Sequence, residues 1–248
     1  MPDTDRDADC PRRLVCQASA SAEKRILERV FCDRIELVVI DHAVWDMDGT
    51  LIDSARAVPE AFVRAVGVLN GPTVNIDDVI AAYWRGTPEV ILAHLVGREL
   101  RLSEHDTYYR ELDGVQVNAY PGVLATLGAL RTGGLPIVVF TGASTRAARI
   151  LLGAAGLEAD IIIGGDRVEN PKPAPDGMRL AAKLLDTTPE RLLLIGDSPL
   201  DLRAAKAAGS FSAAAAWGHM HDPAEPADVT LPTPEDLLPL LRAVTPGD

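Results

Sequence analysis

The chain of 248 residues is poor in cysteine, in positive charge and in long apolar runs. Its three cysteines (Cys10, Cys16 and Cys32) are odd in number and lack zinc-site spacing, so we expect reduced thiols in a cytoplasmic protein. A net charge of −12 argues against nucleic acid or an anionic membrane as a partner. No apolar run approaches the roughly 20 residues that span a bilayer, and the aspartate-rich amino-terminus lacks the order of a signal peptide.

The first 35 residues form an extension to the rest of the chain. Residues 1–22 show no apolar period, so we expect a mobile tail or a loosely docked segment. Apolar residues at helical spacing predict a short amphipathic helix over Glu23–Arg34. The run Ile35–Ile40 is mostly β-branched and apolar, which is typical of an extra strand or of the start of the first core strand.

The remaining chain changes its pattern twice. Between residues 55 and 120, apolar residues recur at three- and four-residue steps, which predicts helices over Ala57–Leu69, Ile76–Tyr83, Pro88–Leu95 and Ser103–Val117. After Pro121, short apolar strands alternate with helices and end in a closing helix over Leu237–Leu241, which predicts a parallel sheet covered on both faces. The predicted fold class is therefore α/β, with a Rossmann-like parallel sheet core (36–54 and 121–248) and an inserted all-helical cap domain (55–120).

Two carboxylates follow the first core strand. The apolar run Ala43–Trp45 ends at Asp46, and Asp48 follows two residues later. Alternation along a strand places both carboxylates on one side, about 6–7 Å apart along the backbone. Two carboxylates this close repel each other unless a positive group lies between them. A hard cation such as Mg²⁺ suits this position, because it prefers oxygen ligands. The alternative is an acidic turn that caps the next helix.

Three further segments carry polar side chains at expected strand ends, where ligands bind in such sheets. Thr141-Gly142 closes a strand and offers a hydroxyl and backbone N–H groups to a phosphate, or it is a simple turn. Lys172 lies between two prolines, which limit its backbone freedom. It either presents a fixed positive charge to a phosphate or carboxylate, or it is a solvated lysine in a proline-rich turn. Asp197 and Asp201 are one helical turn apart after another strand, and they either face one cleft or cap a helix.

These four segments, in this order, resemble the motifs of the haloacid dehalogenase superfamily, subfamily I with a helical cap, in its phosphoglycolate phosphatase-like branch. The resemblance implies that Asp46 is the nucleophile and Asp48 the general acid/base. It also implies that Thr141, Gly142 and Lys172 contact the phosphate, and that Mg²⁺ is the cofactor. The implied metal ligands are Asp46, Asp48, Asp197 and Asp201.

The function implied by the resemblance is hydrolysis of a small phosphorylated metabolite through an aspartyl-phosphate, by a monomer or homodimer. Three alternatives share this family pattern: a phosphomutase of the β-phosphoglucomutase type, an inorganic pyrophosphatase, and a non-catalytic metabolite-binding protein. The mutases more often have Val at the position of Thr50, which favours a hydrolase. All the carboxylates of the pattern are present here, which argues against a non-catalytic protein.

Two loops require separate interpretation. Arg85, followed by Gly86 and a helix start, combines a cation with close backbone approach, so we predict that it recognises the leaving group. The alternative is a solvated charge at a helix end. His219 and His221 have a spacing that suits a metal, but two ligands in a polar loop favour an interpretation as solvated surface residues.

Overall fold

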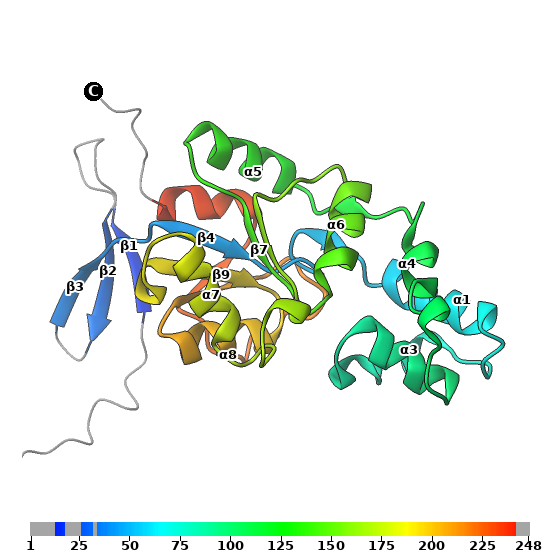
Figure 1. Ribbon diagram of the computed structural model, residues 1–248. Coiled ribbons are helices and arrows are strands. Elements are labelled where there is room, and N and C mark those ends of the chain that lie inside the picture. Colours follow the sequence, from blue (N-terminus) through cyan, green and yellow to red (C-terminus); the bar gives the residue numbers. More distant parts are fainter. Residues whose placement is uncertain (1–12, 18–25, 32–33, 242–248) are drawn as a thin grey trace, which may run out of the picture.

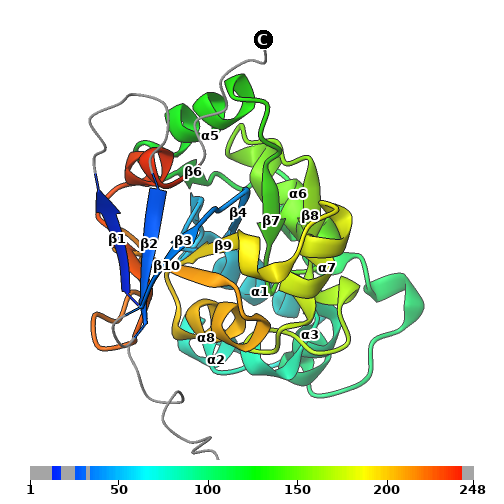
Figure 2. The same ribbon diagram turned by 90° about the vertical axis from the view of Figure 1, so that its left-hand side faces the viewer.

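The computed structural model describes residues 13–17, 26–31 and 34–241 of the chain. Its centre is a six-stranded sheet in the order β11-β10-β9-β4-β7-β8, in which every neighbouring pair is parallel. Figure 2 shows β9 and β10 on one side of β4, with β7 and β8 on the other. The strands are β4 (His42–Trp45), β7 (Val138–Phe140), β8 (Ile161–Ile163), β9 (Leu192–Gly196), β10 (Phe211–Ala215) and β11 (Val229–Leu231).

Helices cover both faces of this sheet, which is why its strands are apolar throughout rather than alternating. Val44 and Val138 pack in one cluster with residues of α7 and α8, whereas Trp45 and Val139 pack in another with residues of α5, α6 and η5. Figure 1 shows α5 above the sheet and α7 and α8 below it. The core helices are α5 (Val123–Thr132), α6 (Thr145–Ala154), η3 (Gly165–Arg167), α7 (Asp176–Leu184), η4 (Pro189–Arg191), α8 (Pro199–Ala208) and η5 (Pro234–Leu240).

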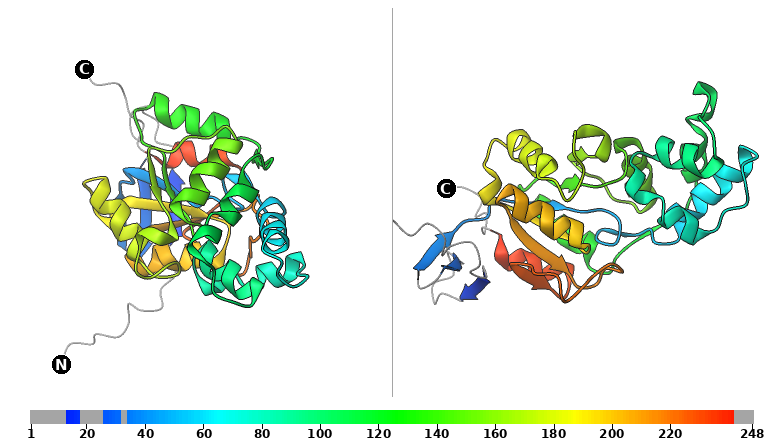
Figure 3. Two further views of the ribbon diagram at one scale, coloured as in Figure 1. Left: turned by 45° about the vertical axis from the view of Figure 1, so that its right-hand side comes forward. Right: turned by 90° about the horizontal axis from the view of Figure 1, so that it is seen from below.

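An all-helical cap is inserted after β4. The chain leaves the core through β5 (Ile52–Asp53) and returns through β6 (Asn118–Ala119), and these two strands pair antiparallel as a two-stranded ribbon. The cap lies at one end of the molecule (Figures 1 and 3). Its helices are α1 (Ala57–Val68), α2 (Ile76–Ile80), η1 (Tyr83–Arg85), α3 (Pro88–Val96), η2 (Leu102–Glu104) and α4 (Thr107–Leu112). The predicted fold class is thus confirmed.

Three predicted helices differ from those observed. The helix predicted over Ile76–Tyr83 is divided into α2, which ends at Ile80, and η1. The helix predicted over Ser103–Val117 is reduced to α4, because Asp113 leaves the helical path with a ψ of 127° and the chain then turns at Gly114, whose φ is +77°. The closing helix predicted over Leu237–Leu241 is the 3₁₀ helix η5, which contains Pro239, a residue with no N–H for an α-helical bond. Among the described residues, no helix has the length and apolar character needed to cross a membrane.

The helix predicted over Glu23–Arg34 is wrong in its described part. Ile26–Phe31 is strand β2, which pairs antiparallel with β1 (Arg13–Gln17) and with β3 (Arg34–Val38). Short apolar runs fit the helical period and the strand period equally well. Here the pairing with strands β1 and β3 decides in favour of a strand. β3 realises the extra strand expected over Ile35–Ile40. Within residues 1–22, where we expected a mobile tail or a loosely docked segment, β1 is a strand paired with β2, and the other residues of that segment lie outside the described part of the chain.

Candidate active site

The site lies where the order of the parallel strands changes direction. The chain adds β7 and β8 on one side of β4 and then β9 and β10 on the other, so the switch point is between β4 and β9. Ligands of such sheets bind at the carboxyl ends of the strands at this point. Asp46 directly follows β4, and Asp197 directly follows β9. The N–H of Asp46 donates to the carbonyl of Ile195 at 2.8 Å, which ties the two strand ends together.

The loop after β4 is folded tightly against Asp197. The N–H groups of Leu51 and Ile52 both donate to the carbonyl of Met47, so the chain completes one turn within five residues. Gly49 has a φ of +85°, and a Cβ there would lie 2.2 Å from Oδ2 of Asp197. A residue with a side chain at this position would displace the carboxylate, so glycine serves both the turn and the close approach.

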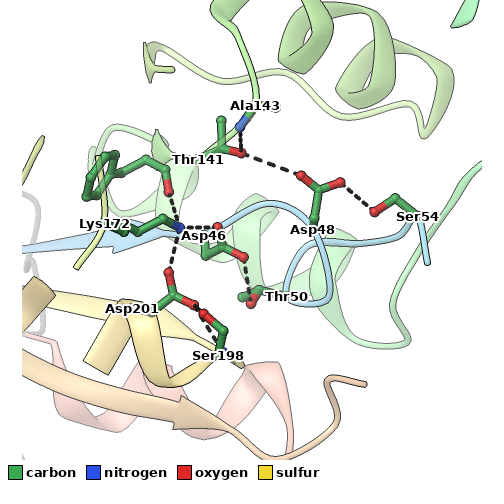
Figure 4. Close-up of polar contacts among 10 residues, drawn as sticks. Asp46, Asp48, Thr50, Ser54, Thr141, Ala143, Lys172, Ser198 and Asp201 are labelled. Carbon is green, nitrogen blue, oxygen red and sulfur yellow. Dashed lines mark hydrogen bonds and ion pairs between the residues drawn. The ribbon is translucent and has the colours of Figure 1, made fainter. Parts of the chain in front are cut away.

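Lys172 connects two carboxylates at the centre of the site (Figure 4). Its Nζ lies 2.6 Å from Oδ1 of Asp46 and 2.5 Å from Oδ1 of Asp201, and it also donates to the carbonyl of Phe140 at 3.3 Å. The side chain of Lys172 is 8% exposed, and those of the two aspartates are 7% and 1% exposed. The three charges are therefore held together out of bulk water.

Burial and neighbouring charges together raise the pKa values of both Asp46 and Lys172. Burial raises the pKa of Asp46 well above its ordinary value, and Asp201 adds to the rise while Lys172 opposes it. Burial alone would lower the pKa of Lys172, but Asp201 and Asp46 outweigh it and raise that pKa. Lys172 is therefore a fixed positive charge that helps to keep Asp46 ionised.

Asp46, Asp197 and Asp201 form a group that suits a cation. Each offers a carboxylate oxygen, and these oxygens lie within 4.8 Å of one another. Asp197 accepts from the N–H of Met220 at 2.9 Å through Oδ2, but its buried Oδ1 has no hydrogen-bond partner in the described part of the chain. A buried, unpartnered oxygen in a group of three carboxylates is unfavourable without a counter-charge. The oxygen-only set fits Mg²⁺.

In the part of the chain that the structure describes, the group of possible metal ligands does not include Asp48, although the sequence analysis named Asp48 as a metal ligand. Its Oδ1 accepts from Ser54 at 2.5 Å, and its Oδ2 accepts from Thr141 at 3.5 Å (Figure 4). Burial raises the pKa of Asp48 above its ordinary value, and the hydrogen bond from Ser54 opposes the rise. A raised pKa favours the protonated form of a carboxyl group, which fits an acid/base better than a metal ligand.

The other predicted site residues lie on two different parts of the fold. Thr141 follows β7, is buried, and accepts from the N–H of Ala143 at 3.1 Å, so it belongs to the site through Asp48. Gly142 is exposed, and a Cβ there would meet no atom within 4 Å, which leaves open space beside its backbone. Arg85 ends the cap helix η1, and its side chain is exposed.

The sequence interpretation missed the loop after β10. The indole N–H of Trp217 donates to the carbonyl of Thr50 at 2.9 Å, and a Cβ at Gly218 would lie 2.2 Å from Cβ of Asp197. His219 is exposed, as the sequence predicted, and its Nδ1 also lies 3.9 Å from Oδ2 of Asp197 and 3.4 Å from the hydroxyl of Tyr120. The position of this loop in the sequence could have identified it. The loop follows a parallel strand, so it lies at the same edge of the sheet as Asp46 and Asp197.

Comparisons with known proteins agree with this geometry. A family model described as haloacid dehalogenase-like hydrolase matches residues 40–209. The phosphoglycolate phosphatase of Escherichia coli O157:H7 is 32% identical over 229 residues, which cover 79% of this chain and 90% of that protein.

Two solved structures share the fold. CbbY from Rhodobacter sphaeroides, solved in complex with phosphate, has a TM-score of 0.68 and 23% identity, covering 80% of this chain and 96% of its own. A candidate β-phosphoglucomutase from Thermotoga maritima has a TM-score of 0.60 and 24% identity, covering 83% of this chain and all of its own. At these identities the likeness concerns the fold alone.

Proposed function

The chain belongs to the haloacid dehalogenase-like hydrolase family, and we propose that it is a Mg²⁺-dependent phosphatase that hydrolyses a small phosphorylated metabolite through an aspartyl-phosphate at Asp46. Its phosphoglycolate phosphatase relatives make it a phosphoric monoester hydrolase. The observation that carries the mechanism is the buried contact of Lys172 with Asp46 and Asp201, beside the unpartnered oxygen of Asp197.

In the first step, a carboxylate oxygen of Asp46 attacks phosphorus. A new O–P bond forms as the bond from phosphorus to the leaving oxygen breaks, and Asp48 gives its proton to that leaving oxygen. The raised pKa of Asp48 supports this role, because it favours the protonated acid before the step. Ser54 and Thr141 hold the two oxygens of Asp48 in place.

In the second step, a water molecule replaces Asp46 on phosphorus. Asp48, now ionised, takes a proton from the water as its oxygen bonds to phosphorus, and the aspartyl O–P bond breaks. Inorganic phosphate leaves, and Asp46 and Asp48 return to their starting states. Thr50 donates to Oδ2 of Asp46 at 3.4 Å, which fixes the orientation of the nucleophile.

Positive charge is needed because a phosphate dianion repels a carboxylate nucleophile. Lys172 supplies one fixed charge within reach of Asp46. A Mg²⁺ ion held by Asp46, Asp197 and Asp201 would supply the rest of the charge that offsets this repulsion. The close approach of Gly49 and Gly218 keeps Asp197 in position for that role.

The first substrate to test is 2-phosphoglycolate, because several relatives of this chain are named phosphoglycolate phosphatases. Release of inorganic phosphate is measured for 2-phosphoglycolate, β-glucose 1-phosphate, pyrophosphate and p-nitrophenyl phosphate, each with Mg²⁺ and with a chelator. We expect Mg²⁺-dependent release from a phosphomonoester and at least a thousand-fold loss in Asp46→Asn, on the order of the loss of a nucleophile.

The same panel separates the alternatives. Conversion of β-glucose 1-phosphate to glucose 6-phosphate at a rate above phosphate release would identify a mutase, and a preference for pyrophosphate would identify a pyrophosphatase. Activity that persists in Asp46→Asn or in the chelator contradicts the proposed mechanism.

A further inference from the structure

A buried hydroxyl network joins the cap to the core through residues outside the β5–β6 ribbon. Tyr109 of cap helix α4 is 5% exposed, and its hydroxyl lies 3.0 Å from Oγ of Ser144, the residue before core helix α6. The same hydroxyl donates to Oε1 of Glu89, in the first turn of cap helix α3, at 2.6 Å. One side chain therefore contacts three elements.

The direction of each hydrogen bond follows from the number of donors. Oγ of Ser144 accepts from the N–H of Ala147 at 3.2 Å, and the single proton of the Tyr109 hydroxyl goes to Glu89. The Ser144 hydroxyl must then donate to Tyr109. The result is a continuous chain from the backbone of α6, through two hydroxyls, to a carboxylate of the cap. Burial and the bond to Glu89 raise the pKa of Tyr109 to about 12, so its hydroxyl remains a donor at neutral pH.

A second contact, at the protein surface, joins the same two helices. The guanidinium of Arg146, in the first turn of α6, lies 4.1 Å from the ring centroid of Tyr109, and it also pairs with Asp106 at the start of α4. The ring of Tyr109 is thus enclosed between core and cap. Cation–π contacts and exposed ion pairs are individually weak, but they add to the buried hydroxyl network.

The position of these contacts gives them a function. The cap is connected to the core by two chain segments, β5 and β6, that pair with each other, which is the arrangement of a hinge. The contacts of Tyr109 lie off this hinge. On the core side, Ser144 lies two residues beyond Thr141-Gly142, and on the cap side, Glu89 lies just after the loop that carries Arg85.

We propose that Tyr109 is a positioning residue that fastens the cap to the first turn of α6 and thereby couples cap closure to the placement of the loop that carries Arg85. This inference extends the proposed phosphatase function, on which its kinetic part rests. When the cap rotates away, Tyr109 must leave Ser144 and Arg146 together. Its hydroxyl therefore contributes to the closed population rather than to the chemical step.

The test combines a distance and a kinetic readout in the full-length chain. Spin labels at exposed Leu102 of the cap and Leu124 of the core, with the three native cysteines changed to serine, report the cap position without substrate. We expect Tyr109→Phe to add a longer-distance component and to raise KM about five-fold without lowering kcat, as for one net hydrogen bond. Adding Ser144→Ala to Tyr109→Phe should change KM little further, because the hydrogen bond between Tyr109 and Ser144 that joins cap and core is already absent in Tyr109→Phe.

Arg146→Ala provides a second variant that keeps the buried network intact, and we expect a smaller shift in the same direction. Arg203→Ala is its matched control. This substitution also removes one surface ion pair, between Arg203 and Glu225, but both residues belong to the core domain and the pair does not join core and cap. An unchanged distance distribution in both Tyr109→Phe and Arg146→Ala overturns the proposal, and so does a fall in kcat at constant KM. The distance readout needs no turnover, so its result stands even if the proposed phosphatase mechanism fails.

Discussion

Replacing Asp197 by Asn should stabilise the metal-free protein while removing its response to Mg²⁺. Asp197 is 2% exposed, and its Oδ1 has no hydrogen-bond partner among the residues that the structure describes. Burial raises its pKa above the ordinary value, so keeping it ionised in the fold costs free energy. An amide keeps the bond from the N–H of Met220 through its oxygen, and it removes one negative charge from the group formed with Asp46 and Asp201, in which the carboxylate oxygens lie within 4.8 Å of one another.

The expected gain depends on pH. A carboxyl group whose pKa is raised by folding imposes no cost below its unfolded pKa of about 4, and the cost grows as pH rises through the folded pKa. The advantage of Asp197→Asn in chelator should therefore be small at pH 4.5 and reach about 2 kcal/mol at pH 8, the usual cost of an unsatisfied buried polar group. For a chain of this size, that corresponds to a rise in Tm of about 4–8 °C.

Thermal unfolding in chelator and in excess Mg²⁺, at both pH values, measures this effect. Asp113→Asn is the matched control, because it removes one charge from an exposed position of the cap. Wild type should gain stability from Mg²⁺, and Asp197→Asn should gain almost none. A variant less stable than wild type at pH 8 in chelator, or an advantage independent of pH, would refute the argument from the unpartnered oxygen.

Two further predictions concern residues outside the cluster of aspartates. If Arg85 recognises the leaving group, Arg85→Ala should reduce kcat/KM for the best natural substrate by about 1.5–3 kcal/mol, as for a charged hydrogen bond, and hardly affect p-nitrophenyl phosphate; equal losses on both substrates would instead indicate phosphate contact or cap closure. Deleting residues 1–22, which removes β1, should change kcat/KM less than two-fold, because no described contact of the site involves that strand; an inactive product would show that the extension is integral to the enzyme.

The parts of the site that were predictable from sequence are those at the ends of the parallel strands. Asp46 and Asp197 each follow an apolar run, and the geometry of parallel sheets brings such ends to one edge. Lys172 was predictable because the flanking prolines distinguish it from an ordinary surface lysine. The roles of these residues, the domain boundaries, the cytoplasmic location and the monomeric or homodimeric state remain predictions.

Other features depend on contacts that no local pattern records. The loop at Gly218 is essential to the packing of Asp197, but a glycine after a strand is common and indicates only a turn. Tyr109 carries apolar periodicity as a core residue would, and only the fold brings its hydroxyl to Ser144. In the extension, Ile26–Phe31 fits helical and strand periods equally well, and the partners β1 and β3 decide.

The most direct test of the central claim is to locate the phosphoryl group on the enzyme. Asp48→Asn retains the nucleophile but has no acid to assist release or to activate water, so an activated aryl phosphate with a good leaving group should still phosphorylate it. Borohydride reduction converts an aspartyl-phosphate to homoserine, which mass spectrometry then assigns to a position. We predict homoserine at position 46 and none in Asp46→Asn. Label at another residue, or turnover without any trapped phosphoryl group, would contradict the assignment of Asp46 as the nucleophile.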